Sequence, residues 1–471
     1  MMWVPNITFL LLTLSISCYG DNPGAKIQVT ERGLQKGVEY LLNKMMANNT
    51  VYPLPDVSGS ENIASEDMGY EFTQIRIIKF YRGTVASQWV PGTGMQVSMQ
   101  NGNATITCNW KLDSWLIKDS GSSVLTLTGL AISMVLEIDR IDPGVPSMAV
   151  VDCQASVQNV DVQMLGGVSY IMDSIKQPVQ DVVKKTVSQQ LCSSIRNQVD
   201  KWDQSVSHLK LNSSLNRFIE ADFSLVNKPE ILGRYANIGL KGLFRLHNES
   251  HSETTFSPEP MTLPDQDGAM IYIGASQSSF DSLAAAYYSA GFLTFQVSQM
   301  AGSKEFTTSE LSAYMPEISQ HFPDPVPVKI QMHATRAPLA FILVNNMTVQ
   351  FGGLLETIAH PAKAEAENIF GVNIVVSVQA NFILSEANGA RGLNLTGSIE
   401  LVRLQIEGSQ QTIKVQKGVV TENGVQRLFR EVVVPVVNEN LASGVLIPST
   451  FLKNASVRME QGFAILAAEL K

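Results

Sequence analysis

Residues 171–209 read IMDSIKQPVQDVVKKTVSQQLCSSIRNQVDKWDQSVSHL and carry an apolar side chain at nearly every third or fourth position. This period is typical of one amphipathic helix of about 30–40 residues, kinked or started at Pro178. A helix this long within a β-rich sequence has to lie along a correspondingly long sheet. Its apolar positions are Ile171, Ile175, Val179, Val182, Val183, Val187, Leu191, Ile195, Val199, Trp202, Val206 and Leu209.

The region before this helix, residues 70–149, has a period of two. Short strands are predicted at 70–77, 95–99, 104–110, 124–128 and 131–138, with glycine-containing turns at 91–94, 101–103 and 120–122. Regular short strands separated by turns indicate an antiparallel sheet or barrel. A shorter helix is predicted over residues 33–49, with Leu34, Val38, Leu41, Leu42 and Met45 on one face.

The second half of the chain repeats this order. A helix is predicted at 279–290, strands at 328–332, 339–350, 374–384 and 393–408, a helix at 425–437 interrupted by Pro435, and a last strand at 457–466. Residues 246–267 contain three prolines and are predicted to be a linker. We therefore expect an N-terminal domain at 21–245 and a C-terminal domain at 268–471.

The composition excludes several classes of protein. Of the 471 residues 45% are hydrophobic and 16% charged, against about 25% charged in a typical domain. Disorder is excluded, because it needs low hydrophobicity and high net charge. The net charge is −9, and residues 1–230 carry 18 basic and 22 acidic side chains. Nucleic-acid binding is excluded, because it requires a basic face.

The N-terminus predicts secretion. Residues 9–16 read FLLLTLSI, the length of a signal-peptide core and shorter than the roughly 20 residues of a membrane span. A signal peptide is expected at 1–20, with no transmembrane segment and no hydrophobic tail for a lipid anchor. Glycosylation sequons agree with an extracellular protein and occur at Asn48, Asn103, Asn212, Asn248, Asn346, Asn394 and Asn454.

The number of cysteines does not decide which of them form a disulfide. Removing residues 1–20 leaves Cys108, Cys153 and Cys192, which permit one disulfide and one free thiol. No cysteine or histidine spacing suggests a zinc site, and the HNESH sequence at 247–251 is not the HExxH order of a metalloprotease. We expect no metal and no cofactor.

No catalytic motif emerges from the sequence. There is no G-x-S-x-G nucleophile elbow, no P-loop and no dinucleotide-binding fingerprint. Cys108 is a conceivable nucleophile, but it lies in a predicted strand without a base nearby, and a buried free cysteine is common. We expect a protein that is not an enzyme; a secreted enzyme with an unrecognised site is the remote alternative.

Several short motifs, in order along nearly the whole chain, resemble the family of bactericidal/permeability-increasing protein and lipopolysaccharide-binding protein, which also includes lipid transfer proteins. The likeness to bactericidal/permeability-increasing protein is the strongest. The motifs are Asn22-Pro23-Gly24, VTERGL at 29–34, LPDVSG at 54–59, YEF at 70–72, VPGTG at 90–94, DFSLV at 222–226, MIY at 270–272, and Ala285, Tyr287, Tyr288, Gly291, Phe292 and Leu293.

The resemblance implies an α+β fold: an elongated two-domain boomerang of two antiparallel barrels, each with a long helix, joined by a central β-sheet. It implies a disulfide between Cys153 and Cys192, with Cys108 free. It also implies apolar pockets that hold the acyl chains of a phospholipid. The helix faces expected to line them carry Leu34, Val38, Leu41, Leu42, Ile171, Ile175, Val179, Val182 and Val183.

The charge departs from that of the family's endotoxin-binding members, whose N-terminal domain is cationic. The segment at the matching tip, residues 110–119, places Lys111 and Lys118 among Asp113 and Asp119. Trp115 can insert into a membrane interface or pack within a strand. Lys79 and Arg82 add local positive charge.

The resemblance thus implies a secreted, antimicrobial protein of innate immunity that binds phospholipid, bacterial lipopolysaccharide and the bacterial outer membrane. The alternative is phospholipid or neutral lipid transfer without endotoxin recognition.

Overall fold

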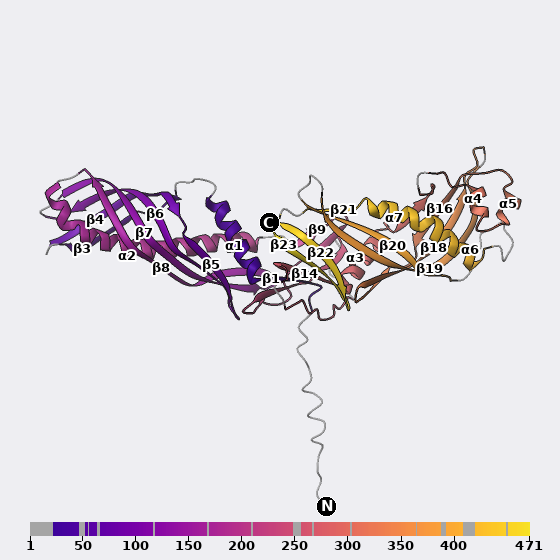
Figure 1. Ribbon diagram of the computed structural model, residues 1–471, viewed down its shortest axis with the longest axis horizontal. Helices are drawn as coiled ribbons and strands as arrows, with labels where there is room; N and C mark the ends of the chain where they lie inside the picture. The colour runs from indigo at the N-terminus through magenta and orange to yellow at the C-terminus, as the bar shows by residue number, and fades with distance from the viewer. Residues whose placement is uncertain are drawn as a thin grey trace, which may run out of the picture. The chain divides into compact units, whose positions relative to one another are not determined.

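The computed structural model describes residues 22–46, 52–54, 56–63, 66–115, 118–166, 169–208, 211–247, 256–265, 268–301, 304–363, 365–387, 392–407, 420–448 and 451–471. The chain forms two compact units. The N-terminal unit consists of residues 29–209 and 228–237, and the C-terminal unit of residues up to 28, 210–227 and 238–471. Each contains a curled antiparallel sheet with helices on it (Figure 1), which confirms the α+β fold class.

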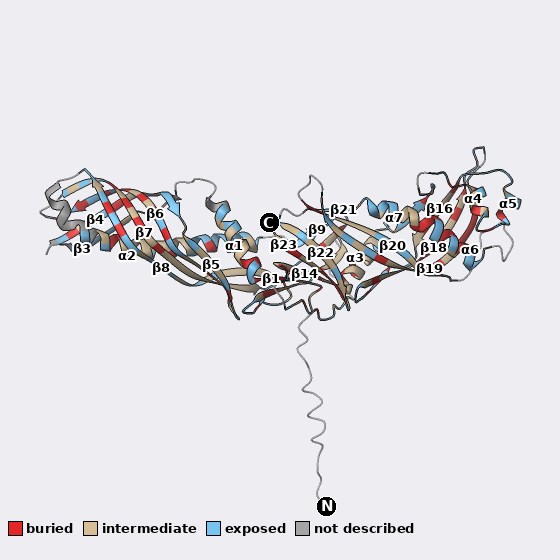
Figure 2. Cartoon of the chain, viewed as in Figure 1, coloured by how far each residue is buried: buried red, intermediate tan, exposed pale blue. Residues whose placement is uncertain are grey.

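A seven-stranded antiparallel sheet forms most of the N-terminal unit. Its order is β2-β4-β6-β7-β8, with β3 beside β4 and β5 beside β6. Buried and more exposed residues alternate along β6 and β7 (Figure 2), because successive side chains of a strand point to opposite faces. The strands are β2 (Tyr52–Pro53), β3 (Val57–Ile63), β4 (Glu66–Tyr81), β5 (Thr84–Val90), β6 (Gly94–Asp113), β7 (Lys118–Ile141) and β8 (Val145–Leu165). A short strand of the same unit, β11 (Glu230–Ile231), lies outside this sheet and pairs with residues 236–237.

Two helices accompany this sheet, α1 (Glu31–Met46) and α2 (Ser169–Ser207). The 39 residues of α2 span about 59 Å at 1.5 Å per residue. The 21 residues of β8, along which α2 runs (Figure 1), span about 70 Å. The long helix therefore does lie along a long sheet. It begins at Ser169, so the expected start at Pro178 is wrong: the helix continues through the proline and absorbs the loss of one backbone hydrogen bond.

Two of the predicted turns are wrong, and both lie inside strands. Residues 101–103 are within β6, at a bulge where Asn101 has φ 57°. Gly121 lies within β7 opposite Trp110, and a Cβ there would overlap the carbonyl of Leu165 and lie 2.9 Å from Cζ2 of Trp110. In a strand, glycine marks a bulge or a close approach as often as a turn. The predicted turn at 91–94 is confirmed, between β5 and β6.

The C-terminal unit contains a second curled sheet, in the order β15-β16-β18-β19-β20-β21 with β17 beside β18. Two further sheets have the orders β13-β10-β9 and β11-β12-β1-β14-β23-β22. Strands β1 and β12 have residues in both units. Residues 210–227 and 238–267, which the sequence assigns to the first domain and the linker, belong to this unit.

The strands of these sheets are β1 (Ala25–Thr30), β9 (Asn212–Ser214), β10 (Ile219–Asp222), β12 (Tyr235–Leu240), β13 (Leu243–Leu246), β14 (Ile271–Ser276), β15 (Thr294–Val297), β16 (Val328–Ala334), β17 (Leu339–Leu343), β18 (Asn346–Ala359), β19 (Glu367–Glu386), β20 (Gly392–Ile406), β21 (Val445–Pro448), β22 (Leu452–Glu460) and β23 (Phe463–Leu470). Two segments predicted as single strands, 339–350 and 457–466, are hairpins: β17 turns into β18, and β22 into β23.

The helices of this unit are α3 (Gln277–Ser289), α4 (Thr308–Ser312), α5 (Ile318–His321), α6 (Glu422–Leu428), η2 (Phe429–Val433) and α7 (Val434–Ala442). Segments α6, η2 and α7 are continuous, and η2 is a π-helical turn in which Val434 N–H donates to the Phe429 carbonyl. Proline has no N–H and crowds the carbonyl four residues earlier. The wider turn accommodates Pro435 without ending the helix.

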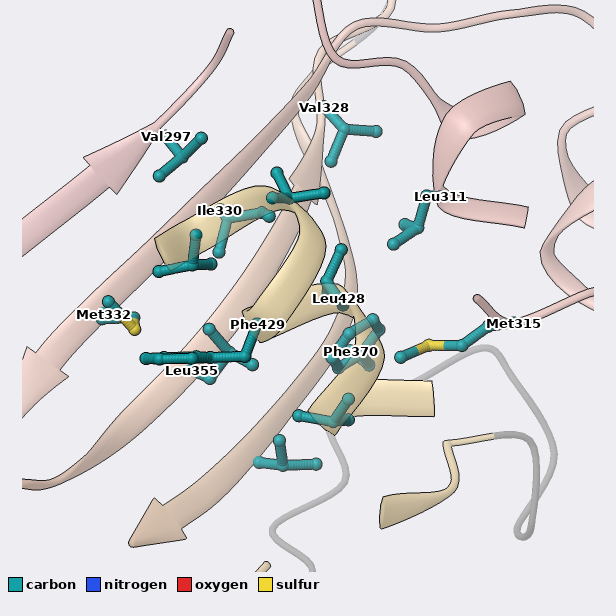
Figure 3. Packing of buried hydrophobic residues seen from close by; sticks show 14 of the residues in the cluster. Val297, Leu311, Met315, Val328, Ile330, Met332, Leu355, Phe370, Leu428 and Phe429 are labelled. Carbon is teal, nitrogen blue, oxygen red and sulfur yellow. The ribbon is translucent and has the colours of Figure 1, made fainter. Parts of the chain in front are cut away.

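A dense core fills the space between α6, η2 and the second curled sheet. Figure 3 shows Leu428 and Phe429 of the helical segments among Ile330, Leu355 and Phe370 of the strands. Phe370 has no exposed surface, and Leu428 is 1% exposed. The chain's own side chains therefore occupy this part of the C-terminal unit.

The contact at Gly121 gives a prediction. Replacing Gly121 with Ala forces Cβ into Trp110 and the Leu165 carbonyl, so the free energy of unfolding falls by about 1–3 kcal/mol, as for other overpacked sites. Gly37→Ala is the matched control, because a Cβ there meets nothing within 4 Å and helical alanine is favoured by about 0.5–1 kcal/mol. Urea unfolding followed by circular dichroism measures both; equal midpoints for the two variants would contradict the contact.

Candidate functional site

A cavity of about 400 Å³ lies in the N-terminal unit between α2, the inner face of the sheet and Leu42 of α1. Small-molecule sites have volumes of about 300–1,000 Å³. The sheet contributes Leu54, Val57, Phe72, Ile75, Ile77, Phe80, Val85, Val97, Met99, Ala104, Ile106, Cys108, Leu125, Leu127, Leu130, Ile132 and Met134, with Arg82 between β4 and β5. The wall is therefore almost wholly hydrocarbon.

Paired irregularities keep the inner face apolar along its whole length. In β6 the lining residues change from odd to even numbers between Met99 and Ala104, and in β7 the parity changes between Leu127 and Leu130. The register between these strands shifts at Gly102, which lies opposite Leu130, and Gly129 has φ 65°. Bulges bend a strand and raise its twist. These two therefore curl the sheet around the cavity without turning polar side chains inward.

The lining residues of the cavity differ in exposure. Ile106, Cys108 and Leu127 are 1–4% exposed, whereas Phe80 is 38% exposed and Trp202 is 37% exposed. The cavity therefore has deeply buried parts and parts whose lining residues reach the surface.

Helix α2 forms one wall with a mixed face. Its apolar lining residues are Val183, Val187, Leu191, Ile195, Val199 and Trp202. Between them Thr186, Gln190, Ser194 and Gln198 also line the cavity, and their spacing of four places them in one row along the helix. The sequence predicted a continuous apolar face. This row of polar residues was not predicted from the sequence. Its regular spacing of four could have identified it.

Two links fix α2 to β8. Cys153 of β8 and Cys192 of α2 form a disulfide with Cα atoms 5.7 Å apart, which confirms the expected pairing. Farther along the helix, the Met148 N–H donates to Oδ1 of Asp203 at 2.7 Å. The wall that α2 provides is therefore held in place independently of whether the cavity contains a ligand.

Cys108 is a free, buried thiol in the lining of the cavity. Burial raises its pKa, and the Ser123 hydroxyl lies 3.1 Å from its Sγ atom. A thiol kept protonated is a poor nucleophile. The geometry therefore assigns Cys108 to the wall.

The residues predicted to line a pocket are divided by the structure. Leu42 and Val183 line the cavity, whereas Val182 is buried in the adjoining core and Leu34 and Val38 pack in a separate cluster around Trp89. Leu41 is 53% exposed. The side chains of Ile171, Ile175 and Val179 lie outside the described part of the structure. The helical period of a sequence identifies the apolar face of a helix. It does not identify which turns of that helix lie at the cavity.

The predicted tip lies at the connection of β6 and β7. Lys111 is exposed at the end of β6, and Trp115 is 78% exposed. Lys118, at the start of β7, forms a surface ion pair with Asp113 at 3.5 Å. The acidic residues interspersed in the sequence thus do contact a tip cation. Residues 116–117 are not among those described.

The described sequons differ in exposure. Asn103, Asn212 and Asn454 are exposed, whereas Asn346 and Asn394 are half-buried. Asn48 and Asn248 lie outside the described residues.

Arg82 is the one charged residue among the described residues that line the cavity. The sequence predicted only that it adds local positive charge; it lies between β4 and β5, close in sequence to Phe80 and Val85 of the lining. Its Nη1 atom is buried and has no hydrogen-bond partner.

No group of three or more histidine, cysteine, aspartate or glutamate side chains that could hold a metal occurs among the described residues. No helix in the described ranges is long and apolar enough to cross a membrane.

The disulfide gives a second prediction. Replacing Cys153 and Cys192 together with Ser opens a loop of 39 residues, so the free energy of unfolding falls by about 3–4 kcal/mol. Urea unfolding of the oxidised wild type and the double variant measures the loss. Dithiothreitol should shift the wild-type midpoint and leave the variant unchanged; a wild type insensitive to reduction would contradict a stabilising link.

Comparisons with known proteins agree with this architecture. Human BPI fold-containing family C protein is 26% identical over 475 residues, covering 98% of this chain and 92% of that protein. Bactericidal permeability-increasing protein of Sebastes schlegelii is 25% identical over 453 residues, covering 95% and 93%. Human lipopolysaccharide-binding protein is 21% identical over 471 residues, covering 98% and 96%.

The fold has a solved counterpart. A crystal structure of lipopolysaccharide binding protein matches with a TM-score of 0.58 at 19% identity, covering 96% of this chain and 99% of that one. Two family models cover nearly all of the folded sequence: that of the LBP / BPI / CETP family N-terminal domain matches residues 33–209, and that of the C-terminal domain matches residues 213–471. The chain therefore belongs to the LBP / BPI / CETP family.

Proposed function

We propose that this protein is a non-enzymatic lipid-binding protein that holds the acyl chains of a phospholipid in the cavity of its N-terminal unit. The observation that carries the proposal is the cavity itself: its walls are hydrocarbon, Cys108 is buried, and the lining residues Phe80 and Trp202 reach the surface. Each buried CH₂ group contributes about 0.8 kcal/mol, so the walls retain an acyl chain without any catalytic group. An apolar cavity of this kind is a poor site for water.

Lipopolysaccharide is the bacterial lipid we propose as a target, at the bacterial outer membrane and in innate antimicrobial defence. Two relatives are named for lipopolysaccharide binding and for increasing bacterial permeability. Lipopolysaccharide is an acylated amphiphile, so it presents chains of the chemistry that the cavity accepts. The exposed Trp115 and Lys111 supply a surface that can meet a membrane interface.

Lipid transfer without endotoxin recognition is the second candidate function. The acidic balance of residues 1–230 and the pairing of Lys118 with Asp113 favour it, because anionic surfaces are attracted by uncompensated cationic clusters. The same cavity serves either function, and the two differ at the tip.

We also propose that the protein is secreted and glycosylated. A disulfide persists in oxidising compartments, and Asn103, Asn212 and Asn454 are sequon residues at the surface.

A cavity-filling variant tests lipid binding. Ala104→Phe places a ring within the lining, so the affinity for acyl chains falls by about tenfold or more. Ala131→Phe is the matched control, because Ala131 lies on the adjacent strand and is not part of the lining. Lipid extracted per mole of purified protein, measured by mass spectrometry, should drop only for Ala104→Phe. A wild type that carries no lipid and takes none from vesicles would refute the proposal.

A charge-reversal pair at the tip separates the two functions. With Lys111→Glu and Lys118→Glu, lipopolysaccharide binding should weaken and lose part of its salt dependence, because two cations near the lipid phosphates are replaced by anions. Surface plasmon resonance at two salt concentrations measures this. Exchange of labelled phospholipid between vesicles with no wild-type binding to lipopolysaccharide would instead select lipid transfer.

A further inference from the structure

The last residues of β4 form an exposed apolar segment that reaches the cavity. Residues 78–81 read Ile-Lys-Phe-Tyr, and all four are exposed. Ile78 is 45% exposed, Phe80 38% and Tyr81 64%, although each is a large hydrophobic or aromatic side chain. Phe80 is also one of the lining residues of the cavity. One ring of this segment therefore lies both at the surface and in the cavity wall.

A bulge decides which side chain of the segment belongs to the lining. The register between β4 and β6 shifts at Ile78, an extra residue between Ile77 and Lys79. Ile77 and Phe80 both line the cavity, although they are three positions apart. In an unbroken strand, alternation would place Lys79 on the inner face together with Ile77. The bulge therefore keeps the cation out of the lining and puts an aromatic ring there.

The charge around the segment is positive, unlike that of the chain as a whole. Residues 72–112 carry four basic and no acidic side chains. Lys79 is exposed and forms no ion pair with a described residue. Across the sheet, the residues paired in its row are Thr105, Thr126 and then Asp161 of β8. The first carboxylate of this row is three strands away, about 14 Å at 4.8 Å per strand, which exceeds a Debye length of about 8 Å.

The segment lies apart from the tip. Phe80 pairs with Ala104 of β6, and Asp113 at the tip is nine residues farther along the same strand. At 3.4 Å per residue this separation is about 30 Å. Substitutions in the segment therefore leave the tip residues Lys111 and Lys118 unchanged in their surroundings.

Exposed apolar rings beside an uncompensated cation fit the surface of an anionic bilayer. Tyrosine is enriched at membrane interfaces, and apolar side chains such as Ile78 and Phe80 enter the boundary between headgroups and acyl chains. A lysine near the surface is attracted by anionic headgroups. Continuity with the cavity favours a lipid partner over a protein, because an acyl chain that leaves a bilayer at this segment meets Phe80, already part of the cavity wall.

We infer that residues 78–81 dock on an anionic phospholipid bilayer and that acyl chains pass between the bilayer and the cavity beside Phe80. This inference rests on the proposed lipid binding and names the surface from which the cavity is loaded.

The test measures docking and cavity binding separately, on the full chain after delipidation. Docking is measured by co-flotation with vesicles of phosphatidylcholine, with and without phosphatidylglycerol. Loading is measured as the rate at which a labelled phospholipid leaves the same vesicles. Cavity binding is measured by titration with a soluble, monomeric fluorescent fatty acid, which requires no bilayer. The variants are Ile78→Ser combined with Tyr81→Ser, and Lys79→Glu, none of which changes a lining residue.

The chain offers a matched control for each variant. Ile141→Ser combined with Val151→Ser removes two apolar side chains that are each 51% exposed and lie outside the lining. Arg196→Glu reverses an exposed cation of α2, also outside the lining. Circular dichroism and urea midpoints confirm that each variant is folded.

Ile78→Ser with Tyr81→Ser should lower vesicle affinity and the transfer rate by about tenfold or more, because the bilayer then buries less apolar surface. Lys79→Glu should weaken binding to vesicles with phosphatidylglycerol by about fivefold or more, and change binding to phosphatidylcholine alone little. Both variants should bind the soluble fatty acid as wild type does. The controls should match wild type in every assay.

Three results would overturn the inference, and they differ in what they leave standing. If wild type binds the fatty acid but the segment variants keep its vesicle affinity and transfer rate, the docking surface is wrong and lipid binding stands. If the variants instead convert a wild-type dimer into a monomer in sedimentation, the segment joins two copies of the chain. If wild type binds neither the fatty acid nor lipid from vesicles, the proposed function fails, and the inference fails with it.

Discussion

The N-terminal unit depends on one packing constraint: a single helix has to cover the inner face of a long curled sheet. Protein interiors are normally as dense as organic crystals. Here α2 packs against inner residues of β4, β6 and β7 at Val182 and Val183, and along other turns of the helix a cavity of about 400 Å³ separates helix and sheet. The space persists because the sheet is curled by bulges near Gly102 and Gly129 and the helix is held by the Cys153–Cys192 disulfide.

That constraint explains why the polar row on α2 is tolerated. In a filled core, Thr186, Gln190 and Ser194 would have to find partners among hydrocarbon side chains, at a cost of about 1–3 kcal/mol for each group left unpaired. These three residues border a cavity instead, so close-packed hydrocarbon does not surround them.

The sequence predicted the elements better than the site. The period of α2 and the alternation of the strands follow from burial of one face, so both long helices and the fold class could be read from the pattern. Glycine positions could not be assigned to turns or strands from the sequence. Gly102 lies at a bulge within its strand, and Gly121 lies in close contact with Trp110. Both causes depend on the neighbouring strand, which the local sequence does not show. The cavity could not be located, since Leu34, Leu41 and Leu42 share one helical face and only Leu42 reaches it.

Comparison of the two units shows that the volume of the side chains on the covering helix decides whether the space beneath it is a filled core or a cavity. In the C-terminal unit, η2 and the end of α6 direct Leu428, Phe429, Val432 and Val433 into the sheet, and all four are at most 5% exposed (Figure 3). In the N-terminal unit, several inward positions of α2 carry Thr, Gln or Ser, which add little apolar volume. Both helices lie on curled antiparallel sheets. The cavity that we propose as the lipid site therefore results from what α2 leaves unfilled, and the Thr, Gln and Ser residues of its inner face are among those that border it.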